Sequence, residues 1–280
     1  MKLPLTVIVL TFNEEKNIEA TLSAAKQLTD DILLVDSYST DNTLNIAQNH
    51  QVHIIQNKFK THTLQWKYAF ENNPFENEWI LALDADQVVS LELANDIYSI
   101  FKNGHKADGY FINRKMYFLG RWIRHGGYYP LYMLKMFRKQ CVYLDEGELM
   151  EHHFYLNGQT ARLKGFITEA NKNETLEFWL NKHIKYAKLQ ATEEASNLKD
   201  TVNRGSLFGD VAARKLFIRK RIWEKMPLFA RPLLYFIYRY IFLLGFLDGK
   251  QGLIFHYLQA FWYRFTVDSL IYEIKNNAKN

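Results

Sequence analysis

The chain has 280 residues, enough for one large domain or for a domain with an appendage. Hydrophobic residues make up 48% and charged residues 23%, so a sizeable core can be buried, and the net charge is +5. Cys141 is the only cysteine, which excludes an intrachain disulfide and a structural zinc site of the Cys type, and fits a reducing compartment. The apolar run 5–10 is too short for a signal peptide and no cleavage-site pattern follows it, so we do not expect secretion.

Short apolar segments alternate with helical patterns in the first half of the chain. Strands are predicted at 5–10, 32–35, 52–55 and 79–83, and helices at 14–27, 41–49, 62–71 and 90–101, the last with Ser90 as its N-cap. This alternation predicts an α/β fold with a mainly parallel sheet covered on both faces. Ligands bind such sheets beyond the carboxyl ends of the strands, so the segments to inspect are 11–15, 36–41, 57–60 and 84–87.

The second half has a different pattern. Strands are predicted at 110–113, 132–137 and 160–163, and a long helix from 174 to about 197. From Ser206 onward the chain is helical, basic and aromatic, with breaks at Pro227, Pro232 and Gly245. We divide the chain into a first domain, 1–170, and a helical region, 171–280.

Basic charge is concentrated between Arg204 and Arg239, where nine Lys and Arg residues stand against two acidic ones. Their mixture with aromatic and aliphatic side chains favours an anionic lipid surface, and we expect no nucleic-acid partner. Residues 228–247 resemble a membrane span in hydropathy but contain Arg231, Pro232 and Arg239. We therefore favour helices lying in the interface over a spanning or re-entrant segment, which stays open.

Two carboxylates separated by one residue, Asp84 and Asp86, follow the fourth predicted strand. Carboxylates are hard oxygen ligands for Mg²⁺ or Mn²⁺, ions that usually bridge a protein to substrate phosphates. In a chain with 13 Asp residues an Asp-x-Asp motif is common by chance, so its place at a strand end gives it meaning. Asp36 ends the second strand, where a carboxylate can bind a ribose hydroxyl or a base edge. Asp41 is more simply a helix cap.

Three segments together resemble glycosyltransferase family 2, which has the GT-A fold. They are Val7-Ile8-Val9-Leu10-Thr11-Phe12-Asn13-Glu14-Glu15, residues 35–43, and Leu83-Asp84-Ala85-Asp86, in the family's order and at its spacing. The resemblance implies an inverting transfer from a nucleotide sugar, often a UDP-sugar. It places Thr11 and Glu14 near the base, Asn13 among the nucleotide-binding residues, Asp36 near the nucleoside, and Asp84 and Asp86 around a metal ion and the diphosphate. Gln87 departs from the acidic residue that often follows the second Asp.

The similarity continues over Arg114, residues 120–130 and residues 136–138, which look like membrane-associated members that build lipopolysaccharide cores and related surface glycans. In those enzymes a segment like 149–153 carries the catalytic base, which implies Glu151 here. Asp145 and Glu148 remain rivals, and a solvated acidic loop remains possible. The resemblance also makes Arg114, Arg121 and Arg124 candidates to bind the substrate's phosphates, with surface charge an equal alternative for Arg121 and Arg124. His152 and His153 are more simply surface residues.

Other enzyme classes fit less well. The turn after the first strand has no glycine, which argues against a Rossmann dehydrogenase and a sugar nucleotidyltransferase. A Gln-x-x-Arg-Trp motif of processive synthases is also missing.

We therefore predict a metal-dependent (Mn²⁺ or Mg²⁺) inverting glycosyltransferase that transfers a hexosyl or related sugar. Its donor would be a nucleotide sugar bound by 1–170, probably UDP-linked, and its acceptor a lipid-linked molecule, a lipopolysaccharide or another surface glycan. We expect a peripheral or monotopic protein at the cytoplasmic face of the inner membrane. The alternative is a catalytically inactive, membrane-bound scaffold that binds nucleotide sugars. Neither the sugar nor the linkage follows from the sequence.

Overall fold

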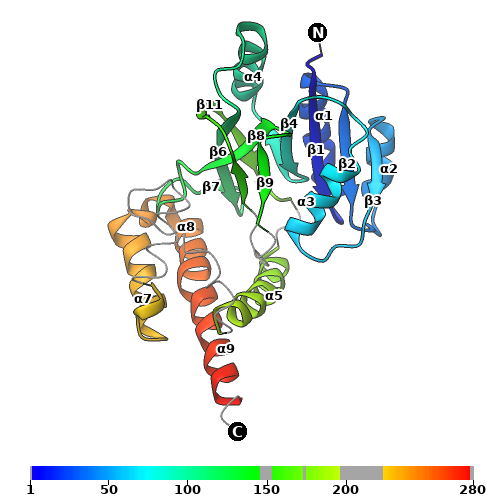
Figure 1. Cartoon of the computed structure of the whole chain (residues 1–280). Helices are drawn as coiled ribbons and strands as arrows, with labels where there is room; N and C mark the ends of the chain where they lie inside the picture. The colour runs from blue at the N-terminus through cyan, green and yellow to red at the C-terminus, as the bar shows by residue number, and fades with distance from the viewer. Residues whose placement is uncertain (1, 146–152, 173–174, 196–222, 278–280) are drawn as a thin grey trace. The chain divides into compact units, whose positions relative to one another are not determined.

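The computed structural model describes residues 2–145, 153–172, 175–195 and 223–277 (Figure 1). The chain forms two compact units, Met1–Thr175 and Leu176–Asn280, called unit 1 and unit 2 below. Each unit has its own hydrophobic core.

Unit 1 is built on one sheet, in which the described residues form nine strands in the order β3-β2-β1-β4-β8-β6-β11-β5, with β7 paired to β6. The first four are parallel neighbours: β3 (His53–Gln56), β2 (Ile32–Asp36), β1 (Leu5–Thr11) and β4 (Trp79–Asp84). The others are β5 (Gln87–Val89), β6 (Gly109–Phe118), β7 (Arg121–Trp122), β8 (Tyr132–Arg138) and β11 (Thr160–Glu169). The side chains of β1 and β2 are buried throughout, which explains their continuous apolar runs. The predicted α/β fold class is confirmed.

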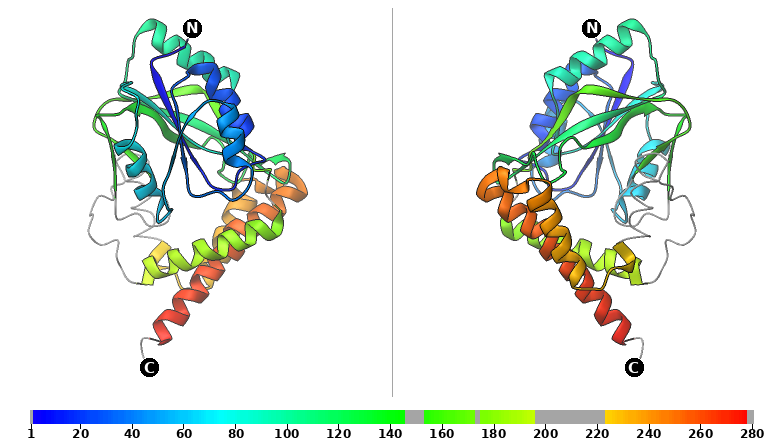
Figure 2. Two further views of the ribbon diagram at one scale, coloured as in Figure 1. Left: turned by 90° about the vertical axis from the view of Figure 1, so that its right-hand side faces the viewer. Right: turned by 90° about the vertical axis from the view of Figure 1, so that its left-hand side faces the viewer.

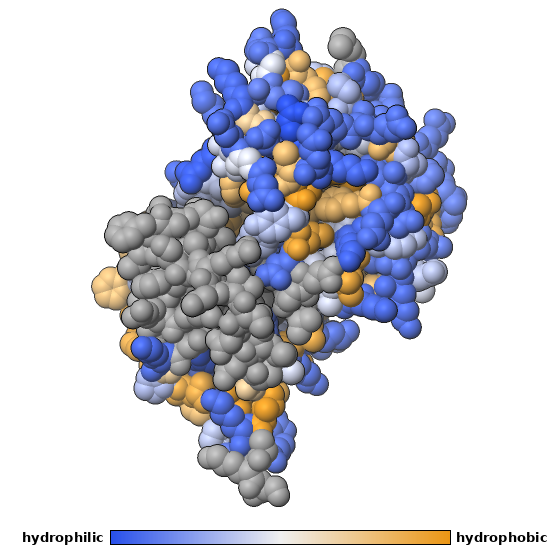
Figure 3. Space-filling model, viewed as in Figure 1, coloured by the Kyte–Doolittle hydropathy of each residue, from blue (hydrophilic) through white to orange (hydrophobic). Residues whose placement is uncertain are grey.

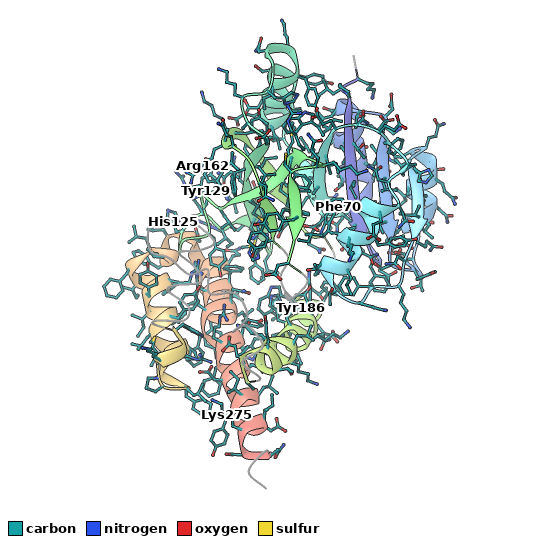
Figure 4. The ribbon with its side chains drawn as sticks, in the orientation of Figure 1. Phe70, His125, Tyr129, Arg162, Tyr186 and Lys275 are labelled. Carbon is teal, nitrogen blue, oxygen red and sulfur yellow. The ribbon has the colours of Figure 1, made fainter. Side chains whose placement is uncertain are left out.

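Helices cover both faces of this sheet (Figure 2). Helices α1 (Ile18–Leu28), α2 (Thr43–Asn49) and α4 (Leu91–Asn103) share one apolar cluster with the strands. Helix α3 (His62–Glu71) packs on the opposite face, where Trp66 and Phe70 meet Phe137 and Phe154; Phe70 is labelled in Figure 4. The predicted cap of α4 is confirmed, because the Ser90 hydroxyl accepts a hydrogen bond from Leu93 N at 3.1 Å.

Helix α1 begins at Ile18, four residues later than predicted. The reason is local: Asn13 has a left-handed backbone (φ 54°), and the amides of Asn17 and Ile18 both turn back to the Glu14 carbonyl. Residues 14–17 thus form a loop at the carboxyl edge of the sheet instead of the first helical turn.

A small hairpin follows the main sheet, formed by β9 (Val142–Leu144) and β10 (Phe154–Leu156). The two strands are antiparallel, with Phe154 opposite Leu144, so both ends of the connection 145–153 are held together. The strands β5, β7, β9 and β10 have only two or three residues each, too few to show a periodic pattern in the sequence.

Unit 2 is helical. It contains α5 (Leu176–Ala195), a 3₁₀ turn η2 (Trp223–Lys225), α7 (Ala230–Ile237), a π-helical turn η3 (Tyr238–Phe242) and a 3₁₀ turn η4 (Gly245–Asp248). It ends with α8 (Gly249–His256), the π-helical turn η5 (Tyr257–Trp262) and α9 (Tyr263–Asn277). Helices α5 and α9 pack through a cluster centred on Ala187, Ala191 and Val267. The predicted long helix is confirmed as α5, and the predicted C-terminal helical region is confirmed.

Arg231 is buried inside unit 2, only 3% exposed. Its Nε donates to Asp268 Oδ1 at 2.7 Å, and one of its terminal nitrogens lies 3.2 Å from Glu194 Oε2. A buried guanidinium held by two carboxylates stabilises the junction of α5, α7 and α9, since an unpaired charge there would be costly. Arg231 was counted in the predicted basic surface, and that assignment is wrong for this residue.

Most of the basic stretch 204–239 lies outside the described residues. Within the described part of unit 2, no single helix is both long and apolar enough to cross a bilayer. One bent pair, Ala230–Phe242 with Gly245–Asn277, passes the length and hydropathy criteria together, with a 72° bend. The predicted segment 228–247 is therefore broken after Phe242, where Leu244 has a left-handed backbone.

Candidate functional site

The carboxyl ends of the four parallel strands bring most of the predicted site residues into one row (Figure 1). Thr11 pairs with Asp36, Asp36 with Gln56, and Leu10 with Asp84 in the register of the sheet. Asp86 follows in the turn between β4 and β5. Residues 13 and 14 leave the end of β1 beside them. The topology thus produces the cluster at the edge where such sheets bind ligands.

The loops after β1 and β2 are fastened to each other. Asn13 N donates to the Ser39 hydroxyl at 2.9 Å, and Asn13 Oδ1 accepts from Thr40 N at 2.8 Å. Glu14 N donates to Thr43 Oγ1 at 2.8 Å. These bonds hold left-handed backbone conformations at Asn13 and Tyr38 and leave the side chain of Tyr38 55% exposed. Rigid loops carrying polar groups and an exposed ring suit a planar ligand such as a nucleobase.

Asp36 is fully buried and holds the second loop. Its carboxylate accepts hydrogen bonds from Ser39 N at 3.0 Å and from Gln56 Nε2 at 2.9 Å. Gln65, which is 1% exposed, links this region to α3 by donating to the Ser37 hydroxyl at 3.2 Å. The sequence analysis did not identify Gln56 or Gln65, because a glutamine in a short strand or in a helix carries no spacing signal.

Thr11 lies between the two loops and is 5% exposed. Its hydroxyl oxygen is buried and has no hydrogen-bond partner among the described residues. A buried polar atom in this state is costly unless an outside group satisfies it, which fits a ligand at the end of β1.

Asp84 and Asp86 are half-buried at the end of β4. Asp84 Oδ2 lies 3.2 Å from Nζ of Lys135, which reaches over from β8. Asp86 Oδ2 accepts a hydrogen bond from Asn171 Nδ2 at 3.3 Å. Thr21 of α1 donates to the carbonyl of Ala85 at 2.7 Å and fixes the turn between the two carboxylates.

Gln87, the predicted departure from the family pattern, is 1% exposed and bridges two groups. Its Oε1 accepts from Asp84 N at 3.2 Å, and its Nε2 donates to Glu169 Oε2 at 3.1 Å. A carboxylate at position 87 could accept but not donate, so it could not make the second bond. The acidic side chain at this place comes instead from Glu169, which is opposite Gln87 in the β11–β5 pairing.

Arg114 completes the cluster from β6. One of its terminal nitrogens donates to both carboxylate oxygens of Glu169, at 3.0 and 3.3 Å. The negative charge of Glu169 raises the pKa of Arg114, with further contributions from Asp84 and Asp86. The predicted phosphate-binding residue thus stands beside the Asp-x-Asp motif as a permanent cation.

A second chain of hydrogen bonds joins the two halves of the row. Asn17, which is 3% exposed, donates to Glu14 Oε2 at 2.6 Å and to Asn171 Oδ1 at 3.1 Å, and Asn171 in turn contacts Asp86. Glu14 and Asp86, 72 positions apart in the sequence, therefore belong to one network.

Arg121 and Arg124 stand on a different segment. Both are exposed, on β7 and the loop after it, and the Arg124 guanidinium lies over the Trp122 ring at 5.5 Å. Figure 4 labels His125 and Tyr129 of the same segment. The structure thus places these two arginines apart from the strand-end row that contains Asp84.

The predicted base, Glu151, lies outside the described residues, as do Glu148 and His152. Asp145 is half-buried at the end of β9, and His153 is exposed at the start of β10. The β9–β10 pairing shows only where the connection carrying these residues begins and ends.

The chemistry of the cluster fits a hard divalent ion. Within the described residues, no group of three or more His, Cys, Asp or Glu side chains is arranged to hold a metal. Mg²⁺ is commonly held by only one or two carboxylates together with substrate phosphates, and Asp84 and Asp86 supply two. The two carboxylates thus fit an ion that is shared with a phosphorylated substrate.

Comparison with curated proteins gives partial matches. An uncharacterized glycosyltransferase of Rickettsia typhi is 32% identical over 106 residues, which cover 38% of this chain and 35% of the relative. The prophage-derived glycosyltransferase SunS of Bacillus subtilis is 34% identical over 93 residues, covering 31% of this chain and 21% of SunS. The matched part spans about a third or less of the length of these relatives.

Solved structures share the fold. The mannosyltransferase PcManGT from Pyrobaculum calidifontis, in complex with GDP-Man and Mn²⁺, has a TM-score of 0.53 and 14% identity over 97% of this chain and 87% of that one. Residues 1–349 of S. aureus TarS, in complex with UDP-GlcNAc, have a TM-score of 0.48 and 17% identity over 99% of this chain and 92% of that one. At these identities the likeness concerns the fold.

The sequence itself matches the family model described as glycosyl transferase family 2 over residues 6–157. This match covers the parallel strands, the Asp-x-Asp motif and the β9–β10 hairpin, and it spans more than half of the chain. The protein therefore belongs to glycosyl transferase family 2.

Proposed function

We propose that this protein is an inverting glycosyltransferase that moves a sugar from a nucleotide-sugar donor to a hydroxyl group of an acceptor. The observation that carries the proposal is the row of strand ends in which Thr11, Asp36, Asp84 and Asp86 stand together. Family membership supports the same activity.

The donor would lie along this row. The exposed rings of Phe12 and Tyr38, each 55% exposed, suit stacking against a base, and the buried hydroxyl of Thr11 suits a polar group of the nucleoside. The diphosphate would then reach Asp84 and Asp86, with Arg114 as the nearest guanidinium of the cluster. We propose a UDP-linked hexose or related sugar as the donor.

Asp84 and Asp86 would hold a Mn²⁺ or Mg²⁺ ion, which when bound offsets negative charge on the departing diphosphate. PcManGT, which shares the fold, was solved with GDP-Man and Mn²⁺. Around these carboxylates, Gln87 and Asn171 fix the turn, and Arg114 supplies positive charge to the cluster through Glu169.

The transfer itself needs a base on the acceptor side. The acceptor hydroxyl oxygen forms a bond to the anomeric carbon while the bond from that carbon to the diphosphate oxygen breaks. The electron pair leaves with the nucleoside diphosphate, and the hydroxyl proton passes to a carboxylate, for which we propose Glu151. Charge builds up on the sugar ring in an oxocarbenium-like transition state, as in glycoside hydrolysis.

The donor proposal is tested by protection against thermal unfolding. We expect UDP to raise the unfolding midpoint of unit 1, and Mn²⁺ to increase the shift, because a ligand that binds only the folded state stabilises it. The comparison uses UDP, GDP, CDP and dTDP, each with Mn²⁺ and with EDTA. Equal shifts for all nucleotides would reject base selection. The absence of any shift would contradict the nucleotide site itself.

We also propose a lipid-linked or surface-glycan acceptor, met at the cytoplasmic face of the inner membrane by a peripheral or monotopic protein. Many large apolar side chains between α7 and η5 are exposed, among them Phe242 at 73% and Leu247 at 49%. Figure 3 shows hydrophobic surface in the lower part of the view. Exposed apolar groups in this number support an interaction surface, and the basic residues nearby in the sequence favour anionic lipid.

Liposome sedimentation tests the membrane proposal. The protein is expected to bind vesicles that contain anionic lipid at low salt and to be released at high salt. Replacing both Phe242 and Leu247 by serine should weaken binding at least about tenfold, since burying each large apolar side chain contributes about 2 kcal/mol. Leu91→Ser on α4 is the matched control, because Leu91 is also 73% exposed. A wild-type protein that ignores these vesicles would refute the membrane assignment and leave the enzymatic proposal standing.

A further inference from the structure

Lys135 is a buried lysine in the middle of an apolar strand. It is 2% exposed, and its neighbours Leu134, Met136 and Phe137 are buried as well. Its Nζ lies 3.2 Å from Oδ2 of Asp84. A lysine is rarely buried without a partner for its charge, and Asp84 is the ion-pair partner that the structure gives it.

The pairing of β8 with β6 explains how Lys135 reaches the motif. Tyr110 is opposite Met136 and Phe111 is opposite Leu134, so Lys135 is the extra residue of a β-bulge. A bulge re-aims a side chain that regular pairing would direct elsewhere, and bulges are frequent beside active sites. The irregularity thus falls on the residue that contacts Asp84.

The charges around the motif nearly cancel. The carboxylates of Asp84, Asp86 and Glu169 face two cations, Lys135 and Arg114, which leaves one net negative charge. A donor-free site of this kind offers little net attraction to a divalent ion, and one oxygen of Asp84 already contacts an ammonium group. A nucleoside diphosphate would bring the missing negative charge.

We propose that Lys135 is a positioning residue that occupies Asp84 in the donor-free protein, so that the metal ion binds together with the nucleoside diphosphate and only weakly alone. This inference rests on the proposed metal-dependent use of a nucleotide sugar. It concerns when the ion binds: the lysine acts as a placeholder cation that makes ion binding and nucleotide binding mutually dependent. Such coupling is reciprocal, so the nucleotide also binds more tightly when the ion is present.

The test measures binding without turnover. Free Mn²⁺ is determined by electron paramagnetic resonance during titration of the full chain, with and without UDP. For the wild type we expect weak Mn²⁺ binding alone and at least about tenfold tighter binding with UDP. Lys135→Met should bind Mn²⁺ alone at least about tenfold more tightly than the wild type, because a unit charge next to a divalent ion is worth at least this factor. The enhancement by UDP should shrink by a similar factor.

Matched variants separate this role from a structural one. Lys135→Arg keeps the charge and should behave like the wild type. Lys115→Met removes one cation from β6, where the Lys115 ammonium lies 3.3 Å from the centre of the Phe166 ring, and should leave Mn²⁺ binding unchanged. Adding Asp84→Asn to Lys135→Met should remove the tighter binding. If Lys135→Met does not fold, Lys135→Gln replaces it with the same expected gain in Mn²⁺ affinity.

The outcomes distinguish this inference from the proposed function. Wild-type coupling between UDP and Mn²⁺, with no tighter binding of Mn²⁺ to Lys135→Met or Lys135→Gln alone, overturns the role of Lys135 and leaves the metal-dependent donor site in place. A wild type without any coupling overturns both.

Discussion

Asp86→Asn is expected to lower kcat/KM at least about a thousandfold while the unfolding midpoint of the ligand-free protein stays nearly unchanged. The loss follows from removing one carboxylate of the proposed metal pair, because the charge stabilisation that a metal supplies to a leaving group is worth several kcal/mol. The fold should survive, since an asparagine oxygen can still accept the hydrogen bond from Asn171 that the Asp86 carboxylate accepts now. Initial rates of sugar transfer and a thermal melt measure the two quantities.

Asp86 is a cleaner target than Asp84. Asn at position 84 would remove the charge partner of the buried ammonium of Lys135, so lost activity there would be mixed with lost stability. Asp30→Asn is a suitable control, because Asp30 is an exposed carboxylate in the same unit that pairs only with surface lysines. Full activity of Asp86→Asn, or of the wild type in EDTA, would contradict the metal proposal.

The sequence was sufficient for the framework of the site. Buried parallel strands read as unbroken apolar runs, so β1, β2 and β4 were predicted within one residue at each end. The residues at the ends of such strands can then be placed at one edge without knowing any contact. Thr11, Asp36 and Asp84 come together for this reason, although the sequence separates them by up to 73 positions.

The groups that surround those carboxylates could not be predicted in the same way. Glu169 belongs to a strand predicted to end at residue 163, and only its pairing with β5 brings it opposite Gln87. Asn171 lies just after that strand, and its contact with Asp86 depends on the same pairing. Pairing between distant strands is a tertiary property, and a local pattern carries no record of it.

Lys135 did leave a signal in the sequence. A single charge inside the predicted apolar strand 132–137 conflicts with a strand buried on both faces, and such local conflicts tend to mark functional or strained sites. The bulge resolves the conflict by turning the lysine toward Asp84. The pattern indicated an irregularity there, but the partner of the lysine required the fold.

Glu151→Gln is the second large expected effect. Glutamine keeps the size and hydrogen-bonding capacity of the side chain but cannot take up the acceptor's proton. We expect kcat to fall at least about a hundredfold, the usual contribution of a positioned base, with little change in UDP-dependent thermal protection, because the donor row at the strand ends is untouched.

Glu148→Gln and Asp145→Asn are the controls for Glu151, since all three residues belong to the chain between β9 and β10. Each control removes one carboxylate from that connection, so a general effect of charge would appear in all three variants. If Glu148→Gln or Asp145→Asn loses activity while Glu151→Gln turns over normally, the role of base moves to that residue. If none of the three affects transfer, the base lies elsewhere. A protein that binds UDP with Mn²⁺ but transfers no sugar to any acceptor, even as the wild type, would favour the nucleotide-sugar-binding scaffold over the enzyme, because only the enzyme requires an acceptor-side base.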